Sequence, residues 1–185
     1  MRLSPIVLAL LLGVAGNSAA RAESPDAQIT HAVEGFYGAY ETFRPPAGVP
    51  DAATRKRLAS FISPALDKLL ADAGDAQARY EKLTQGRFPP LIEGDPFTPN
   101  FDGATSYSVE RCANDARGAH CDVSLSFVNG KDKPHNWTDR VDLIRTNDGW
   151  RVNDIDYGNN GDAGSSGSLS DTFRNAIEHG NEMKQ

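Results

Sequence analysis

The sequence predicts an α+β fold: N-terminal helices packed on a curved, four-stranded antiparallel sheet, followed by a C-terminal helix. Apolar residues recur at steps of three and four up to about residue 84, the period of a helix face. Between about residues 104 and 157 they alternate with polar residues, the period of a strand. A segment with four prolines and three glycines, 86–103, separates the two patterns and predicts an irregular connector.

The first helix is expected over residues 24–43. Ser24 is a favourable N-cap, and Pro25 suits the first helical position. An apolar and aromatic stripe runs along this helix and comprises Ile29, Val33, Phe36, Tyr37, Tyr40 and Phe43. A pair of prolines then ends the helix.

Three further helical stretches are expected. The second begins near Asp51, and Ser63-Pro64 reads as a new cap and first turn, so the helix breaks and restarts there. The restarted helix has an apolar face at Leu66, Leu69 and Leu70. The last helix begins near Leu169, and Gly180 is expected to stop it.

Four strands are expected, over residues 104–113, 120–129, 136–146 and 150–157. In the last two strands the apolar residues move from one face of the sheet to the other, and they do so at positions that pair across the two strands. Either a bulge lies there or both faces are covered; the pattern allows both. In the first hairpin a bulge would reconcile the apolar faces with the position of the cysteines. Because bulges bend strands, we expect a curved sheet.

The two cysteines, Cys112 and Cys121, flank a predicted turn. Structural zinc needs four ligands, and the C-x-x-C spacing of a redox centre is absent. Directly opposed residues of an antiparallel hairpin are close enough for a disulfide. We therefore expect a Cys112–Cys121 disulfide closing a loop over residues 115–118, in which Gly118 is available for a left-handed conformation.

Residues 1–22 have the features of a secretory signal peptide: a charged start, a short apolar run and an A-x-A pattern ending at Ala22. The expected location is periplasmic or secreted, and no stable membrane span is expected. Cleavage after Ala22 removes two arginines and no acid, so the formal charge changes from −6 to −8. That charge argues against a nucleic-acid partner. Residues 23–185 are expected to form one domain, with a flexible linker over 159–168.

Several motifs occur in an order that resembles a known family. Phe36-Tyr37 comes first, Ser63-Pro64-Ala65-Leu66 and Gly94-Asp95-Pro96-Phe97-Thr98 follow, and residues 149–157, GWRVNDIDY, close the series. The chain is similar to a bacterial exported family of unknown function, domain of unknown function 3828, which includes small envelope lipoproteins. This resemblance implies a nuclear transport factor 2-like, or cystatin-like, α+β cone. The chain lacks the lipid-accepting cysteine of the lipoprotein members.

A cone of this kind implies a pocket between the helices and the concave side of the sheet. Six residues are candidates for lining it: Phe36, Tyr37, Tyr40, Trp137, Asp142 and Asp154. Asp142 and Asp154 are the one pair of acids whose spacing predicts contact, although both also suit a solvent-facing position. The Asp95-Pro96-Phe97 segment is expected to organise the connector, with Asp95 capping a turn.

Three functions agree with these features. The first is a non-catalytic module that binds a small apolar ligand or an envelope protein. The second is an inhibitor or immunity-type protein of an envelope enzyme, and the third is a cone-type isomerase or hydrolase of small molecules. No catalytic residue is assigned. No cofactor and no metal centre are expected, because no two histidines have ligand spacing.

Overall fold

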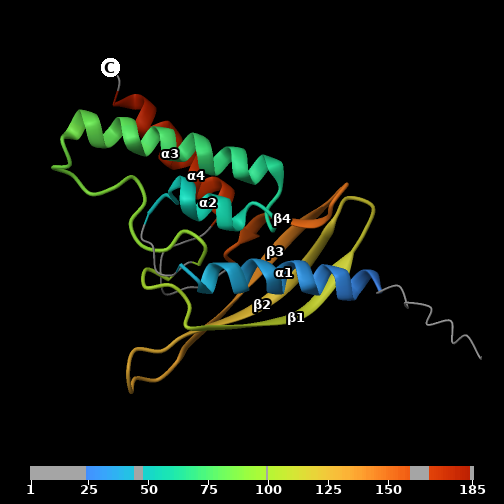
Figure 1. The fold of residues 1–185 in the computed structure, drawn as a ribbon. Helices are drawn as coiled ribbons and strands as arrows, with labels where there is room; N and C mark the ends of the chain where they lie inside the picture. Colours follow the sequence, from blue (N-terminus) through green and yellow to red (C-terminus); the bar gives the residue numbers. More distant parts are fainter. Residues whose placement is uncertain (1–23, 44–47, 99, 159–166, 184–185) are drawn as a thin grey trace, which may run out of the picture.

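The structure is a computed structural model in which residues 24–43, 48–98, 100–158 and 167–183 are described (Figure 1). It confirms the α+β class. The helices are α1 (Pro25–Glu41), α2 (Ala52–Leu58), α3 (Pro64–Thr84) and α4 (Leu169–Glu182). The strands are β1 (Ser106–Asn114), β2 (Ala119–Phe127), β3 (His135–Thr146) and β4 (Gly149–Asp156). The expected signal peptide and most of the expected linker lie outside the described residues.

The four strands form one antiparallel sheet in the order β1-β2-β3-β4, and the sheet does not close into a barrel. Two short segments cover the edge of β4. The Ser63 amide donates to the Val152 carbonyl at 2.8 Å, and the Val152 amide donates to the Phe61 carbonyl at 2.9 Å. Asp156 also pairs with Ser168, just before α4. Backbone groups that would otherwise be exposed on this edge are therefore paired.

Two bulges interrupt the ladders. Between β1 and β2 the register shifts from Val109 opposite Val123 to Cys112 opposite Cys121. This is the bulge that the first hairpin required. Between β3 and β4, Asp142 lies opposite Asp154 but Leu143 lies opposite Val152, which leaves an extra residue on β4. A bulge, rather than apolar cover on both faces alone, thus accounts for the change of faces.

The first hairpin carries the disulfide between Cys112 and Cys121. Cys112 lies directly opposite Cys121, as the sequence predicts. The reason for a glycine in the turn is different from the expected one, because Gly118 does not have a positive φ. A Cβ atom at Gly118 would lie 2.6 Å from the Leu143 carbonyl oxygen of the neighbouring strand. Close approach of two backbones, not left-handed geometry, demands glycine there.

Helix α1 begins as predicted, with the Ser24 hydroxyl accepting from the Ala27 amide at 3.2 Å. Its buried stripe packs against β1, β2 and β4. Helix α3 runs without a break to Thr84, over a stretch where further helical turns were considered. Its packing differs from the expectation, because it contacts mainly α4 and not the sheet, so that the two helices lie together beside the sheet (Figure 1). Within the described residues, no helix has the length and apolar character needed to cross a membrane.

Gly180 does not stop α4, which continues to Glu182. It lies where α4 meets α3 and the connector. A Cβ atom at Gly180 would lie 3.1 Å from the Ala76 Cβ atom and 3.0 Å from Leu91 Cδ1. Glycine at this position therefore permits close packing of the two helices.

Candidate functional site

Five polar side chains meet in the core between α1 and the sheet, and we call them the interior polar cluster. All five are at least nine-tenths buried, and they come from segments far apart in the sequence. Tyr37 and Tyr40 come from α1, Asp95 from the connector, Asp139 from β3, and Tyr157 directly follows β4. Tyr37 is close enough to the other four to be influenced by them electrostatically. Polar groups so deep in a core need an explanation beyond packing.

Local periodicity brings these side chains inward. Tyr37 and Tyr40 are three positions apart, so both lie on the buried stripe of α1. Along β3, alternate residues are buried, and they are Trp137, Asp139, Val141 and Leu143. Asp139 therefore points into the core, because it shares the face of three apolar neighbours.

The connector is fixed to α1 through a pair within the cluster. The Tyr40 hydroxyl donates to Asp95 Oδ2 and accepts from the Ala104 amide at 3.2 Å. The other carboxyl oxygen of Asp95 accepts from the Phe97 amide at 2.8 Å, which closes the turn that the sequence predicts. Gly103 has a φ of 77°, and a Cβ atom there would lie 2.7 Å from both the Tyr40 hydroxyl and Asp95 Oδ2. The Tyr40–Asp95 pair thus fixes the connector to α1.

Asp139 is an acid of the cluster whose carboxyl is strongly perturbed by burial. It is 1% exposed, and burial raises the pKa of its carboxyl from 3.8 to about 7. The indole Nε1 of Trp137 donates to Asp139 Oδ2 at 3.2 Å and opposes that rise, while the charge of Asp156 adds to it. The carboxyl is therefore about half ionised near neutral pH, where it can gain or release a proton.

The Tyr37 hydroxyl is buried and has no hydrogen-bond partner. Burial raises the pKa of Tyr37 well above its usual value of 10.0, and Asp139 is the next largest cause. Tyr157 differs, because its hydroxyl donates to the Pro96 carbonyl at 2.6 Å. Burial also raises the pKa of Tyr157. Both phenols therefore stay protonated at neutral pH, and Tyr37 has a hydroxyl available to another group.

The structure brings four of the six predicted pocket residues to this interior: Phe36, Tyr37, Tyr40 and Trp137. Asp142 and Asp154 are cross-strand partners, as their spacing predicts, but they lie on the other face of the sheet. Asp142 pairs with Arg140 at 3.1 Å. Asp154 accepts from the Ser170 amide at 2.9 Å and so fixes the start of α4 to β4.

Sequence reasoning did not select Asp139 or Tyr157 as site residues. The alternation along residues 137–143 could have predicted that Asp139 is buried, because Asp139 shares a face with Trp137 and Val141. Tyr157 was expected on the face of Ile155, and both are buried. The contact of Tyr157 with the connector depends on tertiary packing, so the neighbouring sequence does not predict it.

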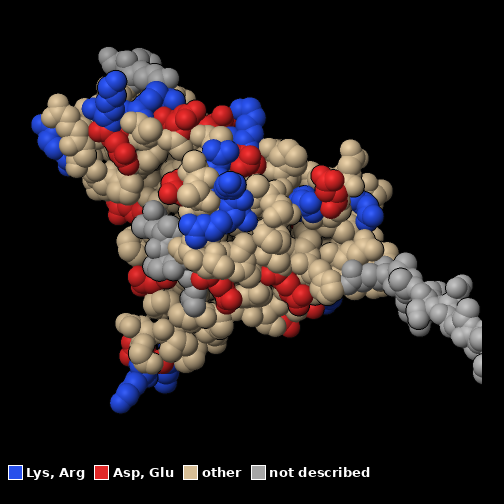
Figure 2. All heavy atoms as spheres, viewed as in Figure 1, with Lys and Arg blue, Asp and Glu red and all other residues tan. Residues whose placement is uncertain are grey.

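The surface hollows and charged groups lie apart from the interior polar cluster. Of four hollows lined by described residues, none includes a member of the interior polar cluster. Among the described residues, no group of three or more His, Cys, Asp or Glu side chains is placed to hold a metal ion. The basic run over residues 55–57 forms part of the outer face of α2, where Figure 2 shows Lys and Arg side chains together. Arg55 pairs there with Asp67 at 3.2 Å.

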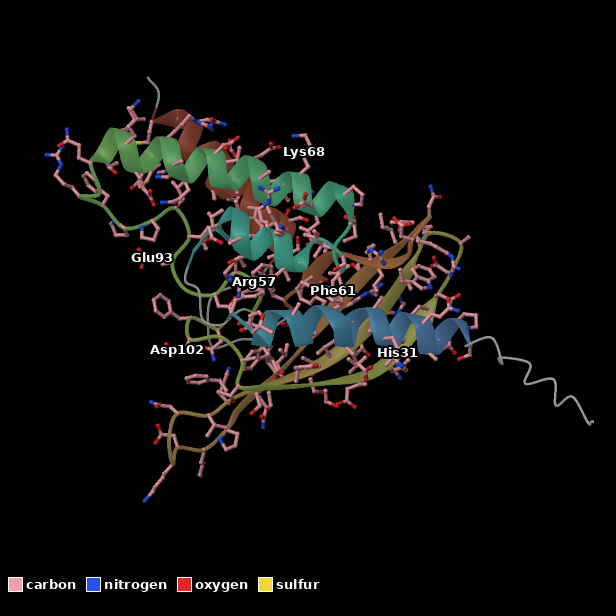
Figure 3. The ribbon with its side chains drawn as sticks, viewed as in Figure 1. His31, Arg57, Phe61, Lys68, Glu93 and Asp102 are labelled. Atoms are coloured by element: carbon pink, nitrogen blue, oxygen red, sulfur yellow. A yellow bond between two sulfur atoms is a disulfide. The ribbon has the colours of Figure 1, made fainter. Side chains whose placement is uncertain are left out.

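The connector contacts the cluster through Asp95 and Pro96, and its acids Glu93 and Asp102 are exposed on its outer side (Figure 3). Asp95, between them, turns inward to Tyr40. Comparison with protein-family models, curated proteins and solved structures gives no match for this chain.

Proposed function

We propose that this chain is an exported binding module that holds a small molecule in the interior polar cluster. Export follows from the signal expected in residues 1–22, and the order of helices and strands supports the nuclear transport factor 2-like cone and the family resemblance. The observation that carries the proposal is the Tyr37 hydroxyl, which is buried and lacks a hydrogen-bond partner, and whose pKa the charge of Asp139 raises further after burial.

The energetic cost of burying the Tyr37 hydroxyl and the Asp139 carboxyl supports a role for them beyond folding. A buried hydroxyl without a partner costs about 1–3 kcal/mol. A buried carboxyl with a pKa of about 7 costs further stability whenever it ionises. Phenylalanine and leucine at these positions would avoid both costs. Two such features at one place are typical of sites that proteins keep for function.

Entry of a ligand requires movement of the cover. Tyr37 is 0% exposed and Asp139 is 1% exposed, so solvent does not reach either polar group in this structure. The connector contacts the cluster through the Tyr40–Asp95 pair and through the Pro96 carbonyl, which accepts from the Tyr157 hydroxyl. Uptake in this proposal proceeds by displacement of the connector, and association is therefore slower than diffusion.

A screen of small metabolites for thermal stabilisation tests the proposal. Ligands should raise the Tm of the wild type and of Asp142→Asn, whose substitution lies on the other face of the sheet. They should not raise the Tm of Tyr37→Phe, which removes only the available hydroxyl. Ligands that stabilise Tyr37→Phe as much as the wild type would contradict an interior site. A screen without any stabilising compound would contradict the proposal as a whole.

Acid–base catalysis on the bound molecule is a second candidate, and the pKa of Asp139 favours it. A carboxyl with a pKa of about 7 suits a general acid or base near neutral pH. For a substrate found in the screen, Asp139→Asn should abolish turnover while the substrate still binds. Equal turnover by the wild type and Asp139→Asn would exclude this role.

A further inference from the structure

The outer edge of β1 is open. Among the described residues, the backbone of β1 pairs with β2 and with no other segment. The opposite edge of the sheet differs, because Phe61, Ser63 and Ser168 pair there with β4. An edge strand directs the N–H and C=O groups of alternate residues outward, and an extended segment can pair with these groups. The two edges are therefore not equivalent, and β1 offers a row of backbone groups to a further strand.

Helix α1 lies along the inner side of this open edge. The Asn114 side-chain amide donates to Asp26 Oδ1 at 3.3 Å, at one end of β1. Toward the other end, the Tyr107 hydroxyl donates to the Glu34 carbonyl at 3.4 Å, and the Tyr107 ring stacks on Tyr37 with centroids 4.9 Å apart. These contacts place Asp26 and Glu34, about two turns apart on α1, next to β1.

The side of α1 that lies beside β1 is acidic. Asp26, Glu34 and Glu41 are all exposed, and Glu41 follows Glu34 by about two turns, so it lies on the same side of the helix. Both glutamates act on the Tyr107 hydroxyl and raise the pKa of Tyr107, although burial is the largest cause. Figure 2 shows Asp and Glu side chains along this side of α1, and Lys and Arg side chains over α2 on its other side.

Basic groups compensate these acids only in part. Arg111 is the one basic residue of β1, and it pairs with Asp122 on β2 at 3.1 Å. Glu110, which precedes it in the bulge, is exposed. His31 of α1 lines a hollow together with the turn between β3 and β4, away from β1. The open edge thus carries net negative charge, which favours a positively charged partner.

We propose that the open edge of β1 binds an extended segment of another protein that carries lysine or arginine at alternate positions. The segment adds a fifth strand to the sheet and pairs with residues 106–109, the regular stretch before the bulge. Alternate side chains of a strand lie on one face, so the basic side chains lie together beside Glu34 and Glu41. This surface is separate from the interior polar cluster, whose members are buried. The inference therefore does not depend on the proposed ligand.

A second copy of this chain fits the edge less well than a basic segment does. Antiparallel pairing of two β1 edges would bring the acidic sides of two α1 helices together. Like charges that face each other across paired strands are destabilising. The bulge and the charges of β1 also protect it from pairing with copies of itself. A basic segment, by contrast, neutralises these charges as it pairs.

Three seven-residue peptides test the charge and the pairing separately. The first alternates valine and lysine, the second alternates valine and glutamate, and the third is the lysine peptide with every backbone amide N-methylated. The third peptide keeps its charge but has no N–H group to donate to β1. Each peptide is added to the ¹⁵N-labelled mature chain at about 0.05 M NaCl, where exposed charges are weakly screened. The amide signals and the hydrogen exchange of β1 are followed by NMR.

The lysine peptide should shift the amide signals of residues 106–109 and slow the exchange of their outward-facing amides at least tenfold. The double variant Glu34→Gln, Glu41→Gln should bind this peptide about fivefold more weakly, because it loses two exposed ion pairs. The control is Glu178→Gln, the same change at an exposed position of α4, and it should bind as the wild type does.

Several results would overturn the inference. If the glutamate peptide binds as tightly as the lysine peptide, the charge of the partner is wrong. If the N-methylated peptide binds as tightly, the partner does not add a strand. Shifts confined to residues outside β1, or no shift at all, would refute the site. A mature chain that dimerises through β1 in solution would show that a second copy occupies the edge. None of these results decides the metabolite screen, which tests the interior site independently.

Discussion

Replacing Asp139 by asparagine should stabilise the folded chain at pH 8 and leave it almost unchanged at pH 4. The pKa of the carboxyl is raised from 3.8 to about 7, chiefly by burial. A group with a raised pKa binds more protons in the folded than in the unfolded state, so stability falls as pH rises between these two values. At 1.36 kcal/mol for each pH unit, the interval corresponds to about 4 kcal/mol. The asparagine avoids this loss, and its amide oxygen can still accept from Trp137.

Urea unfolding followed by circular dichroism at pH 4, 5, 6, 7 and 8 measures the effect. The difference in unfolding free energy between Asp139→Asn and the wild type should grow by about 3.5 kcal/mol from pH 4 to 7 and level off near pH 8. Asp132→Asn, in the exposed turn between β2 and β3, is the control and should follow the wild type. A difference that is the same at every pH would refute the assignment of a protonated, buried carboxyl to Asp139.

Three further expectations use the same unfolding assay. Tyr40→Phe removes a hydrogen bond to a carboxylate and should lower the free energy of unfolding by about 1.5–3 kcal/mol. Tyr37→Phe removes a hydroxyl without a partner, so it should leave that free energy unchanged or raise it by about 1 kcal/mol. Reduction of the disulfide should cost about 2.5–3 kcal/mol, and the untreated mature chain should not react with a thiol reagent. Gly180→Leu should cost about 1–3 kcal/mol through crowding of α3, while Gly74→Leu, where a Cβ atom meets nothing within 4 Å, should be neutral or stabilising.

Local patterns predicted the features that local rules govern. The caps Ser24, Asp51 and Ser63 begin helices as expected, because capping depends on residues within one turn. The register of Cys112 against Cys121 was also predicted, since a short turn and period-two alternation determine it together. The bulge in this hairpin followed from the conflict between that register and the apolar faces.

Features that depend on contacts between distant segments could not be predicted as well from the sequence. The apolar stripe of α3 was visible, but the stripe alone does not say whether a sheet or α4 covers it. Asp142 and Asp154 were correctly paired across the strands, yet the pairing does not decide which face of the sheet meets α1. Asp139 required a further step, because an acid at an apolar face is recognised only after that face is known to be inside.

Within the interior polar cluster, two tyrosine–acid pairs have different consequences for the fold. Tyr40 and Asp95 are joined by a hydrogen bond, and both make further backbone contacts that hold the connector. Tyr37 has a hydroxyl without a partner, and the acid that affects it most is Asp139, whose ionisation the core disfavours. Since removing the first hydroxyl should destabilise the protein and removing the second should not, stability alone explains Tyr40 but not Tyr37. The proposed binding function would give a reason for a tyrosine and an acid at the second pair of positions.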